Sequence, residues 1–244
     1  MVLLLPHGFD GAGPEHSTCH MERFLQNVNS NAYDTVNGAF DNLTGQNINF
    51  QVAQCSTPAN YFHILRRQML RNYRKPLVIA APKIGLKHPR SVSELAEFAP
   101  ETSFQPTIAK DFGNAADIKK LVLCSGKISY DIDALLEKKG DLAHGIRVIR
   151  LEEIAPFPVS DLRHYMGSLS KNTEVVWVQE ESMNQGAFQF AKMHVDRLLQ
   201  EQGYEQEKMS YIGRPSVHSF CTGAGTDYKN QSAQLWSQFD ATVL

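Results

Sequence analysis

The chain has 244 residues, of which 42% are hydrophobic and 20% charged, and its formal net charge is -2. The length is compatible with one large domain or with two of about 110 to 130 residues, and we expect two. The small net charge supplies no general attraction to nucleic acid, and no apolar stretch approaches the length that spans a bilayer, so we expect neither partner. The cysteines are widely separated and form no CxxC pair, which predicts reduced thiols: Cys19, Cys55, Cys124 and Cys221.

The chain begins with an apolar run at residues 2–5, which predicts a strand, and a loop with three glycines and Pro14 follows. No secretory signal or transit segment precedes the strand. We therefore expect either a targeting segment further upstream or a cytoplasmic protein. A helix with one face on a sheet is predicted next, from apolar residues at helical spacing: Met21, Phe24, Leu25 and Val28.

Residues 27–49 are rich in Asn, Gly, Asp and Thr, which favour turns, and predict a long, mobile surface loop. Residues 50–55 and 77–81 are predicted strands. Between them, Ser56-Thr57-Pro58 is a good helix start. The inner face of that helix is predicted to carry Phe62, Leu65 and Met69.

The periodicity weakens between residues 82 and 117, where four prolines occur, and we place an interdomain connection there, with a boundary near residue 110. Beyond it strand and helix patterns alternate. Such alternation predicts a parallel or mostly parallel sheet with helices on both faces. The predicted elements are residues 121–124, 131–138, 146–150, 160–169, 175–178, 185–200, 211–212 and 228–239.

Two histidines on the first loop are the candidate catalytic residues. His7 and His16 follow the first predicted strand, at the edge of a sheet where open α/β enzymes bind their ligands. An imidazole in such a cleft can donate or accept a proton near neutral pH. The alternative is that each ring bonds only to local backbone, and the spacing alone does not decide between the two.

Two other patterns in this region are weaker. His16 and His20 are four residues apart, but the glutamate that metalloproteases place between such histidines is absent, so we predict no metal site. Gly8, Gly11 and Gly13 match neither the dinucleotide fingerprint nor a Walker motif. They predict a flexible loop.

Charged clusters occur at three further places. A basic cluster is predicted to form a solvated or interface face, with an anion or acidic partner as the alternative: Arg66, Arg67, Arg71, Arg74 and Lys75. A polar segment after the strand at 175–178 is predicted to be an interface loop, a helix cap or a rim that repels anions: Glu180, Glu181, Asn184, Gln185 and Gly186. Arg150, Glu152 and Glu153 are predicted to end a strand that leads into a helix.

Five segments, in order, resemble the carboxyl-terminal portion of the thiamine-diphosphate-dependent subunit of 2-oxoglutarate dehydrogenase. They are LLPHGFDGAGPEHS, STPANYFHILRRQ, RKPLVIAAPK, LCSGK and QEESMNQG. The resemblance is more specific than the loop of the Gly-Pro-x-His type that the wider transketolase superfamily shares. It implies an α/β fold: the last strands of a pyrimidine-binding domain over residues 1–105, then a transketolase-like carboxyl-terminal domain over 106–244, with a mostly parallel sheet.

The resemblance also implies an activity. The family's enzyme is the first component of a mitochondrial multienzyme complex of the tricarboxylic acid cycle. It is a homodimer that decarboxylates 2-oxoglutarate with thiamine diphosphate and passes the succinyl group to a lipoyl arm on the succinyltransferase component. His16 matches the family's catalytic histidine, whose expected role is proton transfer or hydrogen bonding to the thiamine-bound intermediate. His7 matches the other loop histidine and is the next candidate.

The remaining cofactor determinants belong upstream in the family. These are the glutamate that activates the aminopyrimidine, the Gly-Asp-Gly segment and asparagine that hold Mg2+ and diphosphate, and the substrate-reading histidines. We therefore expect a fragment that alone neither binds the diphosphate nor turns over 2-oxoglutarate. In a eukaryote the resemblance implies the mitochondrial matrix.

Two alternatives stay open. One is the 2-oxoadipate dehydrogenase subunit, because the segments LRRQM and RNYRKP resemble that relative as well. The other is a non-catalytic assembly or dimerisation module, because the carboxyl-terminal domain of this superfamily makes dimer contacts.

Overall fold

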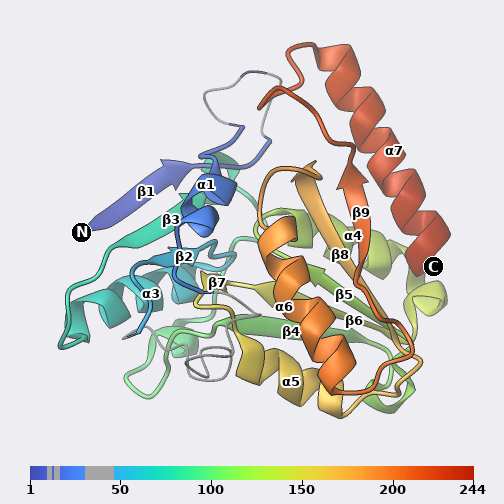
Figure 1. The fold of residues 1–244 in the computed structure, drawn as a ribbon, viewed down its shortest axis with the longest axis horizontal. Coiled ribbons are helices and arrows are strands. Elements are labelled where there is room, and N and C mark those ends of the chain that lie inside the picture. Colours follow the sequence, from blue (N-terminus) through green and yellow to red (C-terminus); the bar gives the residue numbers. More distant parts are fainter. Residues whose placement is uncertain (10–12, 14–16, 31–46) are drawn as a thin grey trace.

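The computed structural model describes residues 1–9, 13, 17–30 and 47–244, and consists of two sheets with helices packed on them (Figure 1). The predicted α/β class is confirmed, because parallel strands and helices alternate along the chain. Within these described ranges no helix is both long and apolar enough to cross a membrane. The predicted mobile loop lies largely at 31–46, and His16 lies at 14–16, both outside the described residues.

The first sheet has the strand order β1-β3-β2-β7. Three of its strands are parallel: β1 (Val2–Pro6), β3 (Leu77–Ala81) and β2 (Gln51–Ala53). The fourth, β7 (Glu153–Ala155), is antiparallel to β2 and comes from much later in the chain. A strand from within residues 106–244 is therefore part of the first sheet.

Helix α1 (Met21–Gln26) buries Met21 and Leu25, as the helical spacing predicts. Helix α3 (Pro58–Leu70) begins as predicted, with the Thr57 hydroxyl accepting the Asn60 N–H at 3.2 Å and Pro58 in the first turn.

The predicted inner face of α3 is wrong for two residues, because Phe62 and Met69 are 43% and 76% exposed. The helix instead buries Asn60 and His63, which have polar partners from distant segments: Asn60 Nδ2 donates to Glu152 Oε2 at 3.0 Å, and His63 Nε2 lies 2.8 Å from the Glu97 carbonyl oxygen. Hydrogen bonds to buried partners outweigh apolar periodicity here.

The second sheet has the order β4-β6-β5-β8-β9, with only the edge strand β4 antiparallel. Its strands are β4 (Thr107–Phe112), β5 (Lys120–Cys124), β6 (Ile146–Leu151), β8 (Glu174–Ser182) and β9 (Ser210–Arg214). Four helices cover it: α4 (Ile128–Lys139), α5 (Val159–Gly167), α6 (Phe188–Glu201) and α7 (Gly225–Val243).

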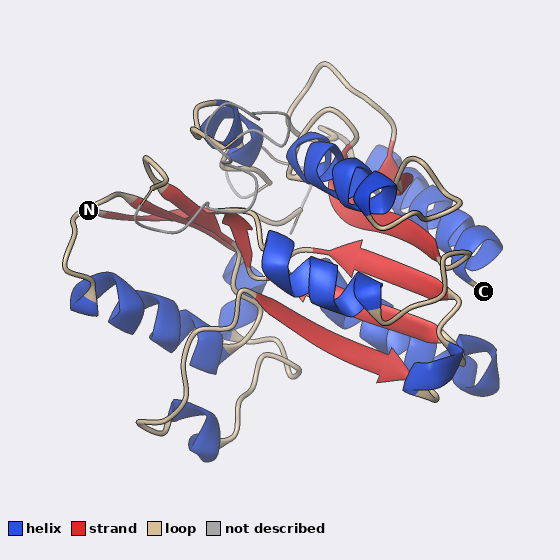
Figure 2. Ribbon diagram, turned by 60° about the horizontal axis from the view of Figure 1, so that its bottom comes forward, coloured by secondary structure: helices blue, strands red, loops and turns tan. Residues whose placement is uncertain are grey.

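The side chains of the central strands alternate between two cores on opposite faces of the second sheet. Leu121, Leu123 and Trp177 pack with α5 and α6. Val122 and Val178 pack with α4 and α7. The predicted helices on both faces are therefore confirmed (Figure 2).

The connection between the sheets has more structure than the sequence indicates. It contains the 3-10 helices η2 (Lys83–Leu86) and η3 (Leu95–Phe98), and β4 begins only three residues before the predicted boundary at 110. Two further 3-10 helices, η4 (Ala115–Asp117) and η5 (Gly140–Ala143), precede β5 and β6. Because β4 is an edge strand with a mixed burial pattern, it carries little apolar periodicity.

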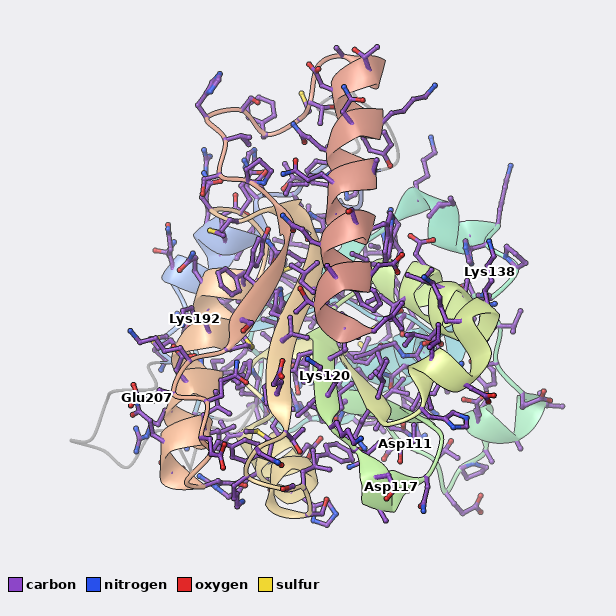
Figure 3. All side chains as sticks on the ribbon, turned by 90° about the vertical axis from the view of Figure 1, so that its right-hand side faces the viewer. Asp111, Asp117, Lys120, Lys138, Lys192 and Glu207 are labelled. Atoms are coloured by element: carbon purple, nitrogen blue, oxygen red, sulfur yellow. The ribbon has the colours of Figure 1, made fainter. Side chains whose placement is uncertain are left out.

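The two ends of the second sheet differ in the contacts that their side chains make. At the amino ends of the parallel strands, Lys120 pairs with Glu174 at 2.5 Å and Asp111 with Arg147 at 2.6 Å, near the surface (Figure 3). At the carboxyl ends the sheet meets the first sheet. There the Gln54 N–H donates to the Glu152 carbonyl at 2.9 Å, and the Ser125 hydroxyl donates to Gln54 Oε1 at 2.9 Å.

Gly126 gives a test of this contact. Its φ is +74°, and a Cβ there would overlap the Gln54 amide group. We expect Gly126→Ala to lower the free energy of unfolding by about 2 to 3 kcal/mol, from backbone strain and the displaced Gln54 hydrogen bond. Urea unfolding measures this value.

The matched control is Gly203→Ala, where φ is +68° and nothing lies within 4 Å of the added Cβ. It should cost only the backbone strain, about 1 kcal/mol. Equal losses in the two variants would show that the Gly126–Gln54 contact contributes nothing.

Candidate active site at the carboxyl ends of the two sheets

Buried ionisable side chains gather where the carboxyl ends of the two sheets meet. His7 follows β1, Glu152 follows β6, and Glu180 and Glu181 lie in the last part of β8. Their exposed fractions are 0% for His7 and Glu152, 8% for Glu180 and 4% for Glu181. Because burying a charge costs several kcal/mol unless it is paired, the partners of these groups determine the local structure.

His7 binds through both ring nitrogens. Nδ1 accepts the Cys19 N–H at 3.2 Å, so the proton on Nε2 is donated to Glu181 Oε1 at 2.5 Å. Burial by itself lowers the pKa of His7, but the Cys19 and Glu181 side chains outweigh it and hold that pKa well above its ordinary value. Burial likewise opposes ionisation of Glu181, yet its hydrogen bond from His7 and the nearby positive charge hold its pKa below the ordinary value.

Glu180 pairs with a different cation. Its carboxylate forms an ion pair with Lys127 in the loop between β5 and α4, and burial raises its pKa. The Lys127 side chain runs past Gly8, where a Cβ would lie 3.1 Å from Lys127 Cε and 2.9 Å from Pro82 Cβ. Gly8 therefore allows Lys127 to pass close to the backbone that follows β1.

Glu152 receives hydrogen bonds from the start of α3. Its Oε2 accepts the Ser56 N–H at 2.8 Å, and its Oε1 accepts the Ser56 hydroxyl. The Arg150 guanidinium donates to the same hydroxyl at 3.2 Å. Burial is the largest influence on Glu152 and raises its pKa, although these hydrogen bonds oppose it.

The side chains of the predicted basic cluster mainly form hydrogen bonds and ion pairs to other segments of the chain. Arg67 holds the Glu153 carboxylate through both terminal nitrogens, and Arg66 donates to the carbonyl oxygen of Thr102 at 3.1 Å. Lys75 donates to the Ile48 carbonyl at 2.7 Å. Side chains of this cluster also line a hollow of about 430 Å³.

A pocket of about 720 Å³ opens beside these groups. Its walls come from the last residue of β1, from the end of β3 and the residues after it, from the start of α3, and from the start of α4 through Lys127 and Tyr130. They include Pro6, Cys55, Ser56, Tyr61, Phe62, Pro82 and Leu86. An apolar pocket with a few polar groups at a sheet's carboxyl edge is the usual form of a site for an organic ligand.

Only one of the two predicted catalytic histidines is described. His7 is fully buried and does not line this pocket, so its geometry suits a residue that positions others, and its catalytic role stays a prediction. His16 lies outside the described residues. His20 approaches Glu22, with Nδ1 and Oε1 3.3 Å apart, and among the residues described no group of three or more His, Cys, Asp or Glu side chains is placed to hold a metal.

Sequence reasoning missed Lys127, Ser56 and Tyr130 as pocket residues. The loop, cap or rim predicted for Glu180 and Glu181 is wrong, because both residues lie within β8, where they are buried and form ion pairs with Lys127 and His7. The sequence carries signals that could have indicated these positions. The segment LCSGK continues an apolar run, and two adjacent acids follow an apolar run at 152–153 and again at 180–181.

Comparisons with known proteins agree with this arrangement. Residues 92–239 match the family model described as 2-oxoglutarate dehydrogenase C-terminal, and residues 1–88 match the transketolase pyrimidine binding domain. A probable 2-oxoadipate dehydrogenase complex component E1 homolog of Dictyostelium discoideum is 44% identical over 237 residues, which are 96% of this chain and 25% of the relative.

Two more relatives lie at similar distances. The 2-oxoadipate dehydrogenase complex component E1 of Homo sapiens is 40% identical over 235 residues, covering 96% of this chain and 24% of the relative. The 2-oxoglutarate dehydrogenase E1 component of Brucella ovis is 40% identical over 243 residues, covering 96% and 22%. This chain thus spans about a quarter of the length of these relatives. On these matches the chain belongs to the 2-oxoglutarate dehydrogenase family of thiamine-diphosphate-dependent, transketolase-like E1 components.

Proposed function

We propose that a protein carrying this chain decarboxylates a 2-oxo dicarboxylic acid with thiamine diphosphate and passes the acyl group to a lipoyl arm on a partner component. The observation that carries the proposal is the match of consecutive segments to the pyrimidine-binding and carboxyl-terminal families of such enzymes. The pocket supports it, because it opens at the carboxyl ends of the strands in the matched pyrimidine-binding region.

The pocket fits the ring portion of the cofactor better than its diphosphate. Pro6, Tyr61 and Pro82 give it apolar walls, and Lys127 and Ser56 add polar groups. No metal-binding cluster occurs among the described residues, so we assign neither Mg2+ nor the diphosphate to them. When bound, thiamine diphosphate supplies the ylid and the electron sink for decarboxylation.

The contributions that we propose for this chain are binding, orientation and proton transfer. Pocket residues hold the ring, the Glu180–Lys127 pair fixes the wall next to Gly8, and His7 holds the loop that follows β1. His16, on that loop, is the proposed group that exchanges a proton with the reacting substrate.

The relatives do not decide between the two substrates. The proposed substrate is 2-oxoglutarate and the alternative is 2-oxoadipate; relatives named for 2-oxoadipate reach 44% identity and one named for 2-oxoglutarate reaches 40%. The lipoyl-bearing partner, the homodimer and the mitochondrial matrix location remain predictions of the family likeness. The other alternative, a non-catalytic assembly or dimerisation module, is a separate outcome of the test below.

The first experiment measures release of carbon dioxide from 2-oxoglutarate and 2-oxoadipate by a protein that carries this chain, with and without thiamine diphosphate. We expect thiamine-dependent turnover, with kcat/KM for 2-oxoglutarate at least about tenfold above that for 2-oxoadipate, since one methylene in a pocket is worth about 1 to 3 kcal/mol. A reversed ratio would assign the adipate homologue. Binding to the lipoyl partner without any thiamine-dependent turnover would support the non-catalytic module.

The second experiment replaces His16 with alanine in the same protein. We expect kcat to fall by about 10²-fold or more, because a positioned acid or base contributes about 10²- to 10⁴-fold. His144→Ala is the control, since that side chain is 65% exposed beside η5, at the opposite end of the second sheet. Unchanged kcat in His16→Ala would remove this residue from the site.

A further inference from the structure

The His7 imidazole and the backbone beside it join the two ends of the segment that follows β1, at Gly8 and at Ser17 to Cys19. The Gly8 N–H donates to the Ser17 carbonyl at 3.1 Å, and the Cys19 N–H donates to His7 Nδ1 at 3.2 Å. The backbone N–H of His7 donates to the Ala81 carbonyl at 3.0 Å, which connects these residues to β3. The described residues on either side of this segment, Gly8 and Ser17 to Cys19, are therefore joined to one another at His7.

Glu181 fixes the other side of this ring. It accepts the Nε2–H at 2.5 Å from the last part of β8, an element of the other sheet. The Tyr211 hydroxyl lies between two carbonyl oxygens, that of Arg214 at 2.8 Å and that of Glu181 at 3.2 Å. Gly186 packs so closely that a Cβ there would lie 3.0 Å from Glu181 Cδ. The Glu181 carboxylate is therefore closely packed as well as buried.

The first side chain of the loop, Phe9, is also held by the second sheet. It is 2% exposed, its ring lies 5.1 Å below the Arg214 guanidinium, and its carbonyl accepts the Tyr228 hydroxyl at 2.9 Å. Arg214 Nε donates to the Glu180 carbonyl at 2.8 Å. Adjacent residues of β8 therefore act on both sides of the point where the loop leaves β1.

We propose that Glu181 is a positioning residue, which acts through His7 to hold Gly8, Ser17 and Cys19 in place beside the neighbouring pocket. It touches neither substrate nor cofactor in this role. The inference rests on the proposed function only in so far as the loop carries His16. The clamp itself is a property of the described residues His7, Gly8, Ser17, Cys19 and Glu181.

The kinetic test is Glu181→Gln in the protein used for the assays above. The amide of glutamine is a neutral acceptor, so it should hold the His7 ring less firmly than the carboxylate does. We expect kcat to fall by about 10- to 100-fold, the size of effect that misplacing a reacting group by about 1 Å has, with KM nearly unchanged. Glu174→Gln is the matched control, since this carboxylate begins the same strand and is 60% exposed. Unchanged kcat in a folded Glu181→Gln protein would overturn the proposal.

A second variant separates position from charge. Glu181→Asp keeps the carboxylate but withdraws it by one methylene, so we expect a loss of kcat close to that of Glu181→Gln. A variant that retains full kcat would show that only the charge matters. This result would contradict a positioning role even where Glu181→Gln fails to fold.

The spectroscopic test needs no turnover and uses the 244-residue chain. At a pH where the His7 ring is neutral, we expect nitrogen-15 spectra to show it protonated on Nε2, with a deshielded proton protected from solvent. The charged and titratable groups around the ring are Glu181, Glu180, Lys127 and the Cys19 thiol. Removing the Glu181 charge should lower the pKa of His7, because the hydrogen bond to Glu181 and its negative charge both raise that pKa.

The two proposals fail in different ways. An absence of thiamine-dependent turnover would defeat the proposed function and leave the spectroscopic result standing. A neutral His7 ring that is protonated on Nδ1, or a ring that titrates identically in wild type and Glu181→Gln, would defeat the clamp whatever the activity.

Discussion

Buried carboxylates at the carboxyl ends of β6 and β8 hold the rest of this structure in register. Glu152, after β6, binds the start of α3, and Glu181 in β8 binds His7, so that two acids from the second sheet reach groups of the first. Glu153, in β7, binds Arg67. Removing one partner of a buried ion pair costs about 3 to 5 kcal/mol, because the other charge is left uncompensated. The two sheets therefore have one favourable arrangement, and the addition of β7 to the first sheet follows from it.

The contacts of these carboxylates between the two sheets also explain why the pocket and the residues that follow β1 lie at the same edge of the structure. Strand β5 lies between β6 and β8, and its carboxyl end supplies Lys127, which both pairs with Glu180 and lines the pocket. Gly8 lets that lysine pass beside β1. Because the same strand ends supply the pocket wall and the clamp on His7, a ligand in the pocket would lie close to the base of the loop.

The sequence predicts the parts of the fold that have strong apolar periodicity or clear caps. Strands at 77–81 and 121–124 and the Thr57 cap are correct, because burial and capping act locally. It misses β4 and β7, a partly exposed edge strand and a three-residue strand, and it assigns Phe62 to the wrong face of α3. The pairing of His7 with Glu181 joins residues 174 positions apart, and no spacing rule reveals such a contact.

The central claim is that these buried pairs make the two sheets one cooperative unit. Amide hydrogen exchange of Val78–Ala80 in β3 and of Leu121–Leu123 in β5 tests it most directly, in native buffer near pH 7. The account predicts that both strands exchange only through global unfolding, with the same free energy, and that Glu181→Gln lowers both values equally. Exchange of β3 at a much lower free energy, with β5 unaffected by the substitution, would contradict it.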